Sequence, residues 1–231
     1  MHSPANSPTQ HHNMLLEQVG KVRTLIDDLS ACTDETAALI ARLQIRSSTL
    51  HSAIALPLDA APLLLADFVV RYIEHVPDFI EAIHAITSDA GIQEQVDPLL
   101  KVALDYFLHP PELVRGHSTL QVLLAEAYLA HRLLEEINDR FITLCGSPLA
   151  PMDTTRANIV AHELIGEPFA IELDQAVLFS ADILLTEHNF KGTAFDRFFA
   201  QHREHGWSVE LSRWPCLAAD RSIFLNFDGQ K

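Results

Sequence analysis

The clearest structural signal in the chain is the stretch TLQVLLAEAYLAHRLLEEINDRFITLC, residues 119–145. Its apolar residues recur every three or four positions, which is the period of one helix face. They are Leu120, Leu123, Ala127, Ala130, Leu134, Ile137, Phe141 and Leu144. Ser118 and Gln121 have capping-box spacing, and Gly146 suits the position just after a helix end. The pattern predicts a long central helix.

A narrower apolar seam lies nearer the N-terminus, within residues 15–54. Its first members recur at a near-heptad period and are Leu15, Val19, Val22, Ile26 and Leu29. Because the polar residues Thr33 and Thr36 then occupy seam positions, we expect the helix to break near Cys32. Narrow seams are typical of helices that pair with one other helix. The segment therefore predicts either a homodimer contact or a helical hairpin packed against the same chain.

Prolines suggest further helix boundaries. Pro77 lacks the backbone donor that a continuous helix uses, so we expect a kink or a restart there. Asp97 and Pro98 have the pattern of a cap followed by a first helical residue. Further helical patterns cover residues 153–165, 169–187 and 193–205.

The fold class expected from these patterns is all-α, a bundle of about six to eight helices. Residues 207–211 alternate between apolar and polar, and residues 222–227 form a second β-like run, which predicts an irregular tail or a short β-hairpin at the C-terminus. We expect a disordered tail at residues 1–13, a helical bundle domain at 14–187, and a C-terminal helix plus irregular segment at 188–231 that packs on the bundle.

The charge balance is acidic, with 16 Lys and Arg against 31 Asp and Glu and a formal net charge of −15. Nucleic acids and anionic membranes are bound through basic surfaces, so neither partner is expected. No stretch matches the run of about 20 apolar residues that a membrane-spanning helix needs. The three cysteines, at 32, 145 and 216, lack zinc-ligand spacing and indicate a reducing compartment. A cytoplasmic protein is expected.

Histidine is frequent, with 13 residues, and two histidines stand near carboxylates at helical spacing. His131 precedes Glu135 by one turn, and His162 lies beside Glu163 on the next predicted helix. If these helices pack antiparallel across the short linker between them, the four side chains could meet. Such a ligand set suits iron, manganese or zinc in a helical bundle. The competing interpretation, which we favour, gives each residue an ordinary hydrogen bond at the edge of the core.

Asp174 shares a stripe with apolar residues, so its burial would require a partner. We expect a salt bridge to an arginine such as Arg132, Arg140 or Arg156.

The sequence contains no nucleophile elbow, P-loop or dinucleotide-binding motif. The expected function is a non-catalytic helical binding or interaction protein without a cofactor, which associates with itself or holds a partner helix or a small apolar ligand. The alternative is a metal-dependent helical-bundle enzyme with a divalent transition metal at His131, Glu135, His162 and Glu163.

Overall fold

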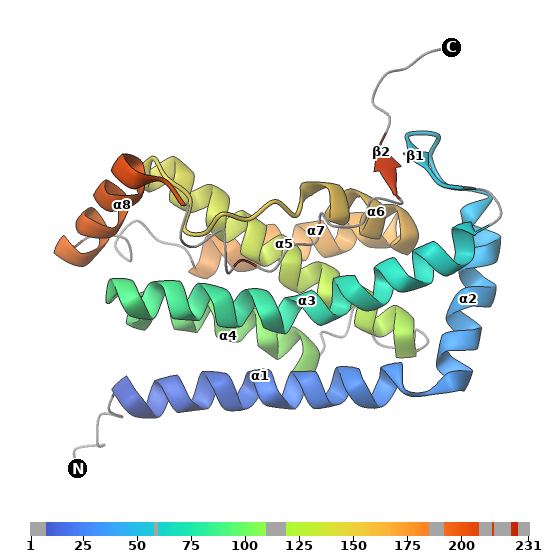
Figure 1. The fold of residues 1–231 in the computed structure, drawn as a ribbon, viewed down its shortest axis with the longest axis horizontal. Helices are drawn as coiled ribbons and strands as arrows, with labels where there is room; N and C mark the ends of the chain where they lie inside the picture. Colours follow the sequence, from blue (N-terminus) through green and yellow to red (C-terminus); the bar gives the residue numbers. More distant parts are fainter. Residues whose placement is uncertain are drawn as a thin grey trace.

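The structure is a computed structural model that describes residues 8–57, 60–109, 119–184, 192–207, 214 and 223–225. Within these ranges the chain forms eight helices and two short strands (Figure 1). In chain order they are α1 (Pro8–Ser30), α2 (Thr33–Ser47), β1 (Ile54–Ala55), α3 (Ala61–Ala90), α4 (Gln93–Leu108), α5 (Thr119–Cys145), α6 (Thr155–Ile165), α7 (Phe169–Leu184), α8 (Thr193–His205) and β2 (Phe224–Leu225). The predicted all-α bundle is confirmed, and α5 has the bounds that its apolar period predicts.

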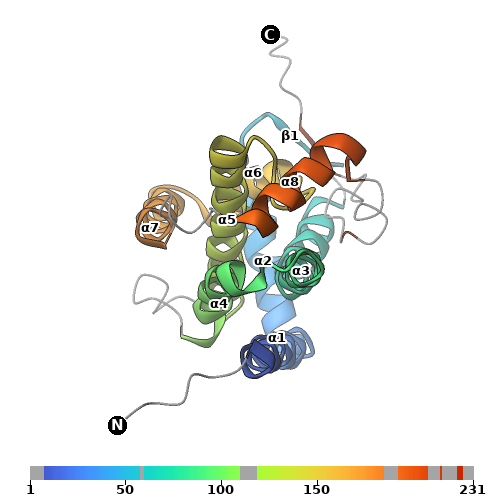
Figure 2. The same cartoon turned by 90° about the vertical axis from the view of Figure 1, so that its left-hand side faces the viewer.

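Helix α5 is the central element, and helices from both halves of the chain pack around it. Its main neighbours are α4 and α7, and α3 and α6 also pack against it. Viewed along its length, the bundle has α1 at one edge and α7 at another (Figure 2). The predicted apolar stripe of α5 forms part of the core, with Leu123, Ala127, Ala130, Leu134, Ile137 and Phe141 all buried.

The N-terminal seam packs within the chain. Leu15, Val19, Val22 and Ile26 are buried, and α1 packs against α3 and α4. The expected break is present, because α1 ends at Ser30 and α2 begins at Thr33. The sequence left open a homodimer contact or packing within the chain, and the residues of the seam pack within the chain. Self-association stays a prediction, and another surface would have to mediate it.

Two prolines lie inside helices. Helix α3 continues through Pro77, so the helix does not restart there, and the expected kink stays a prediction; α4 begins before Pro98, so the predicted start at Pro98 was wrong. A proline in a helix interior costs about 3 kcal/mol. Here buried apolar side chains continue on both sides of each proline, and helix stability in proteins comes mostly from such packing. These side chains are Val76 and Phe79 in α3, and Val96 and Leu99 in α4.

The two strands pair with each other although they are far apart in the sequence. Ile54 lies opposite Leu225 and Ala55 opposite Phe224, in antiparallel register. The second run of the predicted C-terminal hairpin therefore pairs with β1. The first run falls mostly in residues 208–213, which lie outside the described residues.

Two C-terminal tryptophans contact helices of the bundle. The Trp207 ring stacks on His202 with a centroid distance of 4.0 Å, and the Trp214 ring stacks on Phe79 of α3 at 5.2 Å. The C-terminal segment is thus in contact with α3 and α8 at its described positions.

Helix α1 begins at Pro8, so the predicted disordered tail is helical from that residue onward. Residues 1–7, and residues 185–191 at the predicted domain boundary, lie outside the described residues. Among the helices described, none is long and apolar enough to cross a membrane.

Candidate functional site

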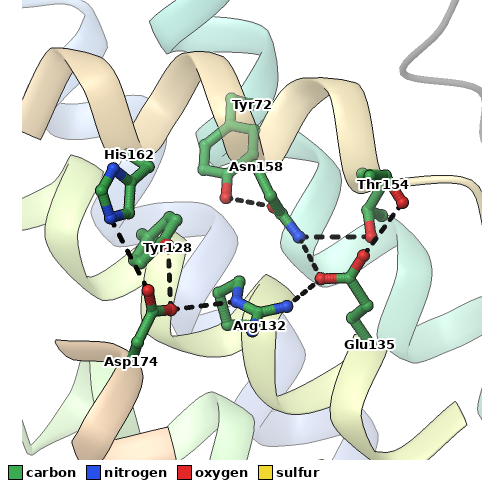
Figure 3. Close-up of polar contacts among 9 residues, drawn as sticks. Tyr72, Tyr128, Arg132, Glu135, Thr154, Asn158, His162 and Asp174 are labelled. Atoms are coloured by element: carbon green, nitrogen blue, oxygen red, sulfur yellow. Dashed lines mark hydrogen bonds and ion pairs between the residues drawn. The ribbon is translucent and has the colours of Figure 1, made fainter. Parts of the chain in front are cut away.

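A cleft of about 370 Å³ lies where α5, α6, α7 and the segment around β1 meet. Its volume falls within the usual range for small-molecule sites, about 300–1,000 Å³. Polar side chains from the three helices meet there in one hydrogen-bonded network (Figure 3). Apolar surface is added by Ala53, Ile54 and Ile159. The cleft is therefore amphipathic.

Helix α5 supplies one wall of the cleft through Tyr128, Arg132 and Glu135. The spacing of these residues, four and then three positions, places them on one face of the helix. That face is directed at α6 and α7, which both pack on α5. A single helix face thus presents a phenol, a guanidinium and a carboxylate to the cleft.

Arg132 links the two carboxylates of the network. Its Nε donates to Asp174 Oδ1 on α7 at 3.0 Å, and its Nη1 forms an ion pair with Glu135. Both acids raise the pKa of Arg132, although burial acts in the opposite direction. All three side chains are half-buried, which makes charge-assisted bonds stronger than on an open surface. The predicted salt bridge of Asp174 to an arginine is confirmed.

Glu135 is also bound from α6. Asn158 Nδ2 donates to Glu135 Oε2 at 2.8 Å, and Thr155 Oγ1 donates to Glu135 Oε1 at 3.2 Å. On the other side, the Tyr72 hydroxyl donates to Asn158 Oδ1 at 2.7 Å. Burial raises the pKa of Tyr72 well above its ordinary value, so this hydroxyl keeps its proton. The amide of Asn158 is therefore held in one orientation between a donor and an acceptor.

Asp174 receives a second bond from the cleft wall. The Tyr128 hydroxyl donates to Asp174 Oδ1 at 2.9 Å, and burial together with the nearby carboxylate raises the pKa of Tyr128. His162 Nε2 lies 3.7 Å from Asp174 Oδ2, which is beyond hydrogen-bond distance. Asp174 Oδ2 thus accepts fewer of these hydrogen bonds than Asp174 Oδ1 does.

The rim of the cleft is held by contacts between α2, α6 and the residues before β1. Arg46 donates from Nε and Nη2 to the backbone carbonyl of Glu163, at 3.1 and 2.6 Å. That carbonyl lies in the last turn of α6, where a cation is favoured by the helix dipole. The Glu163 side chain accepts a bond from the backbone N–H of His51 at 3.1 Å. Arg46 and Glu163 therefore hold α2, α6 and His51 together.

Of the four predicted ligand residues, Glu135, His162 and Glu163 line the cleft. His131 lies elsewhere, fully buried between Tyr72 and Phe79, and its ring centroid is 4.3 Å and 5.4 Å from theirs. Its Nε2 lies 2.8 Å from the Tyr72 carbonyl oxygen, to which it donates, and burial lowers its pKa to about 3. Its Nδ1 has no hydrogen-bond partner within the described ranges.

No group of three or more His, Cys, Asp or Glu side chains that could hold a metal ion is found in the described part of the chain. A metal site that uses both imidazoles stays a prediction. The hydrogen bond that the competing interpretation gave to His131 is present, and its acceptor is a core carbonyl.

Sequence reasoning missed Tyr72, Tyr128 and His51 as members of the network. Tyr128 could have been found, because it lies one turn before Arg132 on the same helix face. Tyr72 and His51 come from distant segments and give no local signal. Comparisons with protein-family models, curated proteins and solved structures find no match to this chain.

Proposed function

We propose that this chain is a non-catalytic binding protein whose cleft holds a small molecule with a positively charged group and an apolar part. The observation that carries the proposal is the charge of the cleft lining. Three carboxylates, on Glu135, Glu163 and Asp174, line it against the guanidinium of Arg132, and the Arg46 guanidinium lies 3.9 Å from Glu163 at the rim, which leaves an excess of one negative charge. A cationic ligand would complement this excess of negative charge.

The ligand's cation would be bound at Asp174 Oδ2. This oxygen is not hydrogen-bonded to His162 at 3.7 Å, whereas Oδ1 already accepts bonds from Tyr128 and Arg132. The apolar part would lie against Ile54, Ile159 and the ring of Tyr128. The sequence predicted a small apolar ligand, and the polar lining favours an amphipathic one.

The network favours binding over catalysis. Arg132, Glu135 and Asn158 bond to one another and to neighbouring protein groups, which orients them before any ligand arrives. Preorganised polar groups of this kind give orientation and specificity in small-molecule sites.

The test uses isoamylamine as the cationic probe and isoamyl alcohol, which has the same carbon skeleton, as the uncharged probe. We expect calorimetry to detect saturable binding of the amine only, and Asp174→Asn to abolish it. Asp182→Asn is the matched control, because Asp182 lies on the same helix but pairs with Arg140 outside the cleft. Equal binding of the alcohol, or unchanged amine binding by Asp174→Asn with native circular dichroism, would refute the proposal.

A further inference from the structure

Helix α7 carries apolar side chains on the side that faces away from the bundle. Its inner side packs on α5 through Ala170, Leu173, Val177 and Ala181, which are all buried. On the outward side, Phe179 is 69% and Ile183 61% exposed, and Ile171 (41%) and Leu178 (45%) are exposed on the flank next to Asp174. We call these four residues the α7 outer face. Soluble proteins rarely gather several large apolar side chains on one surface unless the surface binds something.

The position of α7 leaves this face open among the described elements. Figure 2 shows α7 at the edge of the bundle, beside α5. Its main helix neighbours are α5 and α6, and Tyr106 of α4 also donates to Ser180 Oγ at 3.3 Å. Arg140 Nη2 on α5 bonds Asp182 Oδ1 at 2.6 Å, which places the last turns of α5 and α7 side by side. Leu144, one turn after Arg140 and 43% exposed, extends the apolar surface at this end.

The charges on α7 indicate what kind of partner would fit. The helix contains Glu172, Asp174 and Asp182 but no Lys or Arg. Glu172 and Asp182 are exposed and lie among the apolar side chains of the outer face. Pairing α7 with its copy in a second chain would bring these acids together in either direction, and like charges at close range cost free energy. A partner with basic residues beside its apolar stripe would be attracted instead.

We propose that the α7 outer face is a docking surface for a basic amphipathic helix of another protein. The exposed apolar residues at 171, 178, 179 and 183 span three turns of α7, so a partner helix can lay an apolar stripe along them. Lys or Arg beside that stripe would pair with the exposed Glu172, whereas Asp182 already pairs with Arg140. The test is separate from that of the cleft, because Phe179, the residue it changes, is not among the cleft-lining residues.

The test measures binding of a fluorescein-labelled model helix of leucine and lysine, arranged with helical period, by fluorescence anisotropy. The same peptide with glutamate in place of lysine is the charge control. We expect the basic peptide to bind at least about tenfold more tightly than the acidic one. We also expect Phe179→Ala to weaken binding about tenfold, as the loss of a central aromatic contact usually does. Leu63→Ala is the matched control, because Leu63 is 61% exposed on α3.

Other outcomes would overturn the proposal. Equal loss of binding in Leu63→Ala and Phe179→Ala, or no loss in Phe179→Ala, would show that the peptide does not bind the outer face. A dimer seen by light scattering that Phe179→Ala dissociates would assign the face to a second copy of the chain. Cosedimentation with phosphatidylcholine vesicles that Phe179→Ala abolishes would assign it to a lipid surface.

Discussion

Glu126 is a buried acid in the core-facing part of α5, and replacing it with glutamine should change how stability depends on pH. The side chain is only 2% exposed, and burial raises its pKa from 4.5 to about 8. An acid with a raised pKa holds its proton in the folded state at pH values where the unfolded chain has lost it. The variant Glu126→Gln keeps the size and hydrogen-bonding capacity of the protonated acid but cannot ionise.

The sign and size of the effect follow from this pKa difference. Below pH 4.5 the carboxyl group is protonated in both states, and the stabilisation from its proton is fully present. As the pH rises to about 8, the unfolded chain ionises and the folded chain does not, so stability is lost. Each pKa unit corresponds to about 1.4 kcal/mol. By this relation the wild type should lose about 2 to 3 kcal/mol through Glu126 between pH 5 and pH 7, and Glu126→Gln should not.

The assay is urea unfolding of wild type and Glu126→Gln at pH 5, 6 and 7, with the difference between the two proteins compared across pH. Taking this difference removes the contributions of all other titrating groups, provided that they are unchanged. Glu94→Gln is the control, because Glu94 is exposed on α4 and its variant should follow the wild type. If the difference between wild type and Glu126→Gln is the same at pH 5 and pH 7, the reasoning about Glu126 is refuted.

Four further predictions test the network and the core. Arg132→Met leaves two half-buried carboxylates without their guanidinium, so we expect urea titration to show a free energy of unfolding lower by about 2 to 4 kcal/mol. The more exposed Arg140→Met should lower it by under about 1 kcal/mol. Equal losses in the two variants would contradict a special role for Arg132. The pKa of His131 is lowered to about 3 in the folded protein, so as the pH drops below 6.5 the unfolded chain takes up a proton that the folded chain does not, and wild-type stability should fall. In His131→Phe this fall should be smaller. An unchanged pH profile of stability would argue against a neutral buried imidazole. Gly166 has a φ of 86°, and a Cβ there would lie 2.9 Å from Arg46 Nη2. Gly166→Ala should therefore lower the free energy of unfolding by about 1 to 3 kcal/mol in urea titrations, and a neutral effect would contradict this backbone strain and close approach. Elemental analysis of protein purified without a polyhistidine tag should find no stoichiometric iron, manganese or zinc, and one metal per chain would revive the metal-dependent alternative.

The fold was predictable where one signal dominated. The apolar stripe of α5 and the glycine that follows it indicate the same helix, so its bounds could be predicted, whereas the predicted cap Ser118 lies outside the described residues. A restart at Pro77 and a start at Pro98 are absent because local chemistry and tertiary packing compete there, and packing prevails over a cost of about 3 kcal/mol. The pairing of β1 with β2 involves two residues on each side, too few to leave a periodic signal.

The candidate site was predictable only in part. The short linker between α5 and α6 brings Glu135, His162 and Glu163 to one cleft, as the antiparallel model required. His131 lies one turn from Glu135, but its ring is directed at α3, where Tyr72 and Phe79 surround it. A residue at the border of two helix faces can direct its side chain to either face, depending on which helices pack beside it. Helical spacing alone does not specify those neighbouring helices.

The pairing of β1 with β2 has a consequence for the order in which the molecule is completed during synthesis. The helices contact near neighbours in sequence and can begin to pack while translation continues. The N–H of Ile54, on the wall of the cleft, already donates to the His51 carbonyl at 2.9 Å, but its strand pairing must wait for Leu225. The nascent chain would therefore have most of its bundle before it has a finished cleft. A ribosome stalled shortly before codon 225 should display a compact, protease-resistant bundle that does not yet bind ligand.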